Sequence, residues 1–83
     1  MNIIIYTKTN CGWCAEVLDL LLEYNIPFEE RNVSESREFM KEMIDKSDQS
    51  LAPTLDIDGE ILADAGADEV EAYLKEKGVI KDL

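Results

Sequence analysis

Two cysteines are the residues of this sequence whose types and spacing are best suited to chemistry. Cys11 and Cys14 are separated only by Gly12 and Trp13, and the 83-residue chain contains no other cysteine. At the start of a helix, such a pair places its first sulfur beside unpaired backbone N–H groups and the positive end of the helix dipole, which favour a thiolate. We therefore expect Cys11 to be a nucleophile and Cys14, one helical turn later, to be the resolving thiol in disulfide exchange.

Other roles for the pair agree less well with the sequence. A structural zinc site needs four ligands, and the chain has no histidine and no further cysteine to complete one, so we predict no metal site. A purely stabilising disulfide would close a loop of a few residues, which removes little entropy from the unfolded chain. Two ordinary core cysteines are the remaining alternative. The lack of histidine also excludes Ser-His and Cys-His catalysis.

Hydrophobic patterning predicts the elements that would position the cysteines. The β-branched run at residues 2–6 is typical of a buried strand, and residues 7–12 form a polar turn. From Trp13 the apolar residues recur at helical spacing as far as residues 24 and 25, and Pro27 ends the helix. The apolar stripe of this helix is predicted to contain Val17, Leu18, Leu21 and Leu22.

A second strand and helix follow. Residues 28–33 indicate a strand whose polar positions place it at an edge of the sheet. Asn32 or Ser34 is expected to cap the next helix, and residues 46–50 to form the loop after it. The apolar stripe of this second helix is predicted to be Phe39, Met40, Met43 and Ile44.

The last part of the chain indicates a hairpin and a final helix. Residues 54–57 and 60–63 are predicted strands joined by the two-residue turn signal Asp58-Gly59. Asp68 is expected to open a helix that ends at Gly78. The resulting order is β-α-β-α-β-β-α, an α/β fold in which a four-stranded mixed sheet is flanked by three helices. Residues 1–83 then form one domain.

Composition narrows the classes of partner. The chain is 46 % hydrophobic and 33 % charged, as expected for a globular domain, and carries a net charge of −11. That charge argues against nucleic acid and anionic membranes, which both need a positive surface. No apolar stretch approaches the roughly 20 residues of a membrane span, and the N-terminus does not resemble a signal peptide. We expect a cytoplasmic monomer.

Two segments resemble the glutaredoxin family. The first is similar to the active-site segment of that family and reads Ile5-Tyr6-Thr7-Lys8-Thr9-Asn10-Cys11-Gly12-Trp13-Cys14. The second is similar to the cis-proline strand and hairpin and reads Ala52-Pro53-Thr54-Leu55-Asp56-Ile57-Asp58-Gly59. The element order agrees with the family over essentially the whole chain. The resemblance implies a thioredoxin-like (glutaredoxin) fold and a thiol–disulfide oxidoreductase that reduces protein disulfides or glutathione mixed disulfides.

The resemblance also implies how the substrate is held. Pro53 would be cis and would face Cys11, and the backbone of Ala52 would pair with an extended substrate as an added strand does. Disulfide-containing proteins would be the substrates. No tightly bound cofactor is implied, and glutathione would be the reductant or co-substrate.

Three further residues are candidates for substrate binding. Lys8 lies three residues before Cys11 and could add positive potential there or bind a carboxylate of the ligand. Asp64 could bind an ammonium group. Trp13 offers a flat apolar surface beside the thiols, and we favour a contact role for it over a place in the core.

The sequence also departs from the family in two places. Ala52 stands where glutaredoxins usually have valine, and residues 62–68 lack their paired glycines. These departures keep two alternatives open. One is a glutaredoxin-like redoxin that takes electrons from thioredoxin reductase and donates them to ribonucleotide reductase. The other is a protein that holds a [2Fe–2S] cluster, for which the small Gly12 after the first cysteine would be suited.

Overall fold

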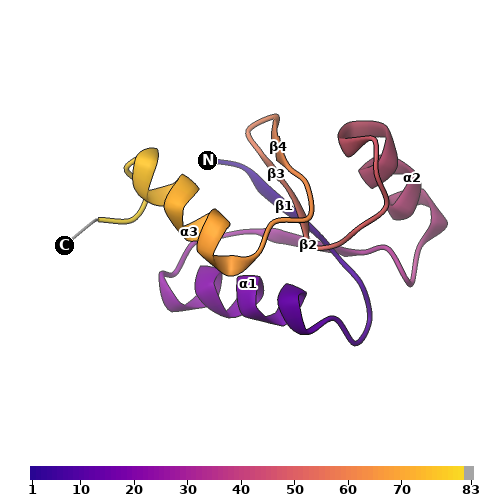
Figure 1. Cartoon of the computed structure of the whole chain (residues 1–83), viewed down its shortest axis with the longest axis horizontal. Coiled ribbons are helices and arrows are strands. Elements are labelled where there is room, and N and C mark those ends of the chain that lie inside the picture. Colours follow the sequence, from indigo (N-terminus) through magenta and orange to yellow (C-terminus); the bar gives the residue numbers. More distant parts are fainter. Residues whose placement is uncertain (82–83) are drawn as a thin grey trace.

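A mixed sheet of four strands forms the centre of the computed structural model, which describes residues 1–81 (Figure 1). The strand order is β2-β1-β3-β4, with β1 parallel to β2 and antiparallel to β3, and with β3 and β4 forming a hairpin. The strands are β1 (Ile3–Thr7), β2 (Glu29–Asn32), β3 (Thr54–Ile57) and β4 (Glu60–Leu62). The polar β2 lies at an edge, as its sequence predicted.

Three helices cover the two faces of this sheet: α1 (Gly12–Glu23), α2 (Arg37–Ser47) and α3 (Ala67–Glu76). Successive side chains of a strand point to opposite faces, so β1 supplies both cores. Ile3 and Ile5 pack with residues of α1 and α3, whereas Tyr6 packs with Met43 of α2. The helices α1 and α3 therefore lie on one face and α2 on the other (Figure 1). The predicted thioredoxin-like fold is confirmed.

Both later helices begin at other residues than the sequence indicated. Ser36 caps α2 and accepts a hydrogen bond from the N–H of Phe39, whereas Asn32 ends β2 and its side chain accepts the N–H of Ser34 in a local turn. The predicted cap at Asn32 or Ser34 was wrong because both side chains have other partners: Asn32 accepts within the turn, and the Ser34 hydroxyl accepts the N–H of Thr9. The helix α3 starts at Ala67, one residue before Asp68, with Gly66 as its N-cap, and α2 continues through residue 47 into the predicted loop.

Two apolar side chains that were assigned to buried stripes are exposed. The buried positions of α1 are Cys14, Val17, Leu20 and Leu21. Leu22 lies about 100° further around the helix and is 62 % exposed. Ile44 of α2 is 40 % exposed for the same reason, since Met43 occupies the centre of that face.

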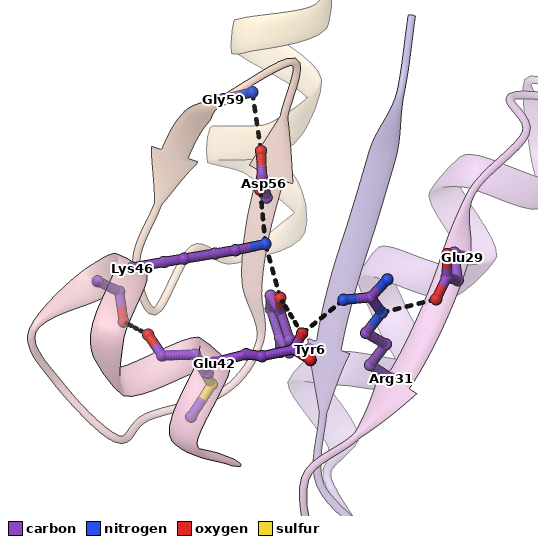
Figure 2. Close-up of polar contacts among 9 residues, drawn as sticks. Tyr6, Glu29, Arg31, Glu42, Lys46, Asp56 and Gly59 are labelled. Carbon is purple, nitrogen blue, oxygen red and sulfur yellow. Dashed lines mark hydrogen bonds and ion pairs between the residues drawn. The ribbon is translucent and has the colours of Figure 1, made fainter. Parts of the chain in front are cut away.

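Polar contacts, together with the small core around Tyr6, hold α2 against the sheet (Figure 2). The Tyr6 hydroxyl donates to Glu42 at 2.9 Å and accepts from Lys46 at 2.8 Å, and Lys46 also pairs with Asp56 at 2.8 Å. Burial opposes ionisation of Asp56, but hydrogen bonds from Lys46 and from the N–H of Gly59 outweigh it and lower the pKa of this carboxyl. The network extends through the ion pair between Arg31 and Glu42 to the edge strand β2.

Candidate active site

Cys11 and Cys14 lie at the junction of β1 and α1 and form a disulfide. Asn10 adopts the left-handed conformation that turns the chain out of the strand, and Cys11 is the N-cap residue of α1. The Sγ atom of Cys11 accepts the backbone N–H of Cys14 at 3.1 Å, the bond that an N-cap side chain normally makes. An N–H that already points at this sulfur would stabilise a thiolate there when the disulfide opens.

The two sulfurs differ in access. Cys14 is 2 % exposed and belongs to the buried side of α1, whereas Cys11 is half-buried, and both cysteines line a surface hollow with Lys8. Cys11 is therefore the more accessible of the two cysteines. This asymmetry agrees with the predicted roles of attacking and resolving thiol.

The loop before β3 places a backbone carbonyl beside the accessible sulfur. The Ala52–Pro53 bond is cis, as the family resemblance implied. The Sγ atom of Cys11 lies 4.0 Å from the carbonyl oxygen of Ala52. Pro53 is buried, and Ala52 is partly exposed beside the disulfide. The carbonyl of Ala52 thus lies beside Cys11, and its role in substrate binding stays a prediction.

Two residues that the sequence did not single out fix this loop. The buried Thr54 hydroxyl donates to the carbonyl of Leu51 at 2.8 Å and accepts from the Gln49 amide at 3.0 Å and from the N–H of Asp64 at 3.3 Å. Gln49 also accepts the N–H of Leu51 at 2.7 Å. Thr54 was interpreted only as a strand residue and Gln49 only as loop. A threonine directly after Pro53 was the available signal, because strand threonines that are fully buried need partners for their hydroxyl.

The other predicted binding residues lie on two sides of the disulfide. Lys8 shares the hollow that Cys11 lines. Trp13 is 66 % exposed, which excludes a place in the core, and it lines a groove between α1 and α3 together with Asp64. Their roles in substrate binding stay predictions.

Within residues 1–81, no three acidic, cysteine or histidine side chains are grouped so that they could hold a metal ion. No helix in the same part of the chain is both long enough and apolar enough to cross a bilayer.

The family model for glutaredoxin matches residues 3–62, from β1 to β4, and this range includes both cysteines and the cis-proline. The chain belongs to the glutaredoxin family. As a member of that family it is a thiol–disulfide oxidoreductase, and Cys11 and Cys14 are its redox-active pair. The matched range ends before Asp64 and α3.

Similar proteins agree with this assignment. A glutaredoxin-like 8.6 kDa protein from the rubredoxin operon of Clostridium pasteurianum, itself uncharacterised, is 31 % identical over 71 residues, which are 86 % of this chain and 95 % of that protein. The crystal structure of the thioredoxin-like protein BC3987 superposes with a TM-score of 0.78 at 27 % identity and covers 84 % of this chain and 96 % of that one. The solution structure of glutaredoxin from Brucella melitensis has a TM-score of 0.68 at 29 % identity, with 94 % of this chain and 82 % of that chain covered.

Proposed function

We propose that this glutaredoxin-family protein reduces disulfides of protein substrates, and mixed disulfides with glutathione, by a dithiol mechanism. The observation that carries the proposal is the difference in access between the half-buried Cys11 and the buried Cys14, together with the N–H of Cys14 that points at Cys11. In the reduced protein, the Cys11 thiolate attacks one sulfur of the substrate disulfide and releases the other as a thiolate. Cys14 then attacks Cys11 of the mixed disulfide.

The attack of Cys14 on the mixed disulfide completes the reduction of the substrate. It forms the Cys11–Cys14 disulfide and releases the second substrate thiol, so two electrons and two protons pass to the substrate. Cys14 needs only a small displacement to react, since the Cα atoms of the two cysteines are 5.2 Å apart in the oxidised protein. The backbone of Ala52 holds the substrate segment beside Cys11, as an added strand pairs with an exposed edge.

Replacement of each cysteine tests the assignment of roles. Cys14→Ser should accumulate a mixed disulfide between Cys11 and an oxidised protein substrate, visible by mass spectrometry under non-reducing conditions. Cys11→Ser should form no adduct and should abolish reduction. Accumulation of adducts on the Cys11→Ser protein, with none on Cys14→Ser, would reverse the roles.

The source of electrons is a second part of the proposal. Membership of the glutaredoxin family and the position of Lys8 beside Cys11 support glutathione. The net charge of −11 favours a protein reductant such as thioredoxin reductase over an anionic tripeptide, and ribonucleotide reductase would then be a suitable acceptor.

Turnover of an oxidised peptide with NADPH separates the two reductants. Glutathione with glutathione reductase should support turnover if glutathione is the reductant, and thioredoxin reductase alone should support it if the redoxin alternative holds. Activity with neither system, together with visible absorption of the purified protein, would instead support the cluster-holding alternative.

A further inference from the structure

A groove between α1 and α3 begins at Trp13, directly beside the redox-active pair. Leu20 and Ala67 contribute apolar surface to it, and Trp13 lies at its active-site end with two thirds of its surface exposed. Six carboxylates that line the groove make no ion pair or hydrogen bond through their side chains within residues 1–81: Glu16, Asp19, Glu23, Asp64, Asp68 and Glu69. A seventh carboxylate, Glu71, pairs with Lys75.

Only some of these acidic residues stabilise the helices that carry them. Asp68 and Glu69 lie in the first turn of α3, where acidic residues interact favourably with the helix dipole. The acids of α1 have the opposite arrangement. Glu23 is the last residue of α1, where the dipole disfavours a negative charge, and Asp19 lies four residues before it, where like charges repel. The carboxylates of Asp19 and Glu23 therefore oppose the stability of the helix that carries them.

The shape of the charge distribution indicates the kind of ligand. The acids are spread along the facing sides of two elements and are not gathered into a metal-binding group within residues 1–81. An extended segment with several positive side chains complements such a line of charges. The exposed face of Trp13 can in addition receive an arginine or lysine by a cation–π contact.

We propose that this groove binds a lysine- or arginine-bearing segment of the protein substrate, adjacent to the cysteine whose disulfide is attacked. Trp13 stands between Cys11 and Cys14 in the sequence, so a chain joined to Cys11 can continue directly into the groove. The inference rests on the proposed function, because it assumes that a substrate protein is joined to Cys11 during the reaction. It adds a rule of selection: disulfides with basic flanks are preferred over neutral and acidic ones.

Single-turnover kinetics with matched peptides test this preference. The reduced protein is mixed with oxidised peptides that share one disulfide and differ only in flanks of arginine, serine or glutamate. Trp13, the only tryptophan, reports oxidation of the adjacent pair by fluorescence. We expect the second-order rate constant of the basic peptide to exceed that of the acidic one by about tenfold or more, within the usual range of electrostatic steering. The difference should largely disappear at 1 M salt, where the Debye length is about 3 Å.

Two charge variants distinguish the groove from the overall negative charge. Asp19→Asn/Glu23→Gln neutralises two acids of the groove, and Asp45→Asn/Asp48→Asn neutralises two exposed acids at the corresponding end of α2, on the opposite face of the sheet. Both variants remove two negative charges near the end of a helix. The groove variant should lose most of the preference for the basic peptide, and the α2 variant should keep it.

Equal loss in both variants would assign the preference to net charge and overturn the inference. Equal rates for all three peptides with the unaltered protein would overturn it as well, while leaving disulfide exchange intact. Failure of the reduced protein to exchange with any peptide would refute the proposed function itself, and the inference with it.

Discussion

Replacement of Thr54 by valine should both destabilise the protein and slow its reaction. Valine has nearly the shape of threonine but lacks the hydroxyl, which makes three hydrogen bonds around the cis-proline loop. At about 0.5–1.5 kcal/mol each, these bonds would together contribute roughly 1.5–4.5 kcal/mol. The Gln49 amide keeps its bond to Ser47 in the variant, and Leu51 and Asp64 are exposed residues, which places the loss in the lower part of this range, at about 2 kcal/mol.

Thermal unfolding of the oxidised proteins measures this loss. One kcal/mol corresponds to about 4–8 °C in a domain of this size, so Thr54→Val should unfold roughly 8–16 °C below the unaltered protein. Thr54→Ser is the matched control, because it keeps the hydroxyl and removes only a methyl group. The loop carries Ala52, so kcat/KM for an oxidised peptide should fall in Thr54→Val and recover in Thr54→Ser. A valine variant as stable and active as the unaltered protein, or less affected than the serine variant, would refute this account of the loop.

Two further predictions concern the helix cap at the active site and the ion pair beneath α2. In a Cys14→Ser background, Cys11→Ala should be less stable than Cys11→Ser by about 1 kcal/mol. The reason is that serine can still accept the N–H of residue 14, whereas alanine cannot. Equal urea midpoints for the two variants would contradict the capping role. The pKa of Asp56 is lowered in the folded protein, so its contribution is present above the ordinary value near 4 and is lost as pH falls through the folded value. Asp56→Asn should therefore cost about 1 kcal/mol at pH 7 and progressively less as pH falls through the folded pKa of Asp56, as measured by urea unfolding at a series of pH values. A constant difference would show that ionisation is not involved.

The sequence predicted those features that depend on one local pattern. The β-branched run of β1, the Asp58-Gly59 turn and the place of the cysteines at the start of a helix each have a short-range physical cause, and each was confirmed. The cis state of the Ala52–Pro53 bond followed from the family resemblance alone, because most bonds before proline are trans.

Features that depend on contacts between distant elements could not be obtained in this way. Thr54 binds partners both before and after it in the chain, and only the folded loop shows why its hydroxyl matters. The pairing of Lys46 with Asp56 joins α2 to β3, and residue 46 was assigned to a loop because polar residues at a helix end resemble those of a turn. The groove beside Trp13 likewise exists only because α1 and α3 pack side by side.

The two faces of the sheet are held by different kinds of interaction, and only one of them carries the cysteines. On the α2 face, Tyr6, Lys46 and Asp56 are joined by charge-dependent bonds, so acid weakens the attachment of α2 to the sheet. On the other face, an apolar core fixes α1, and with it Cys11 at the helix start and Cys14 on the buried side. The contacts that position the cysteine pair include none of these charged side chains. The carboxylates of the groove could thus be varied to select substrates without altering the core that positions the disulfide.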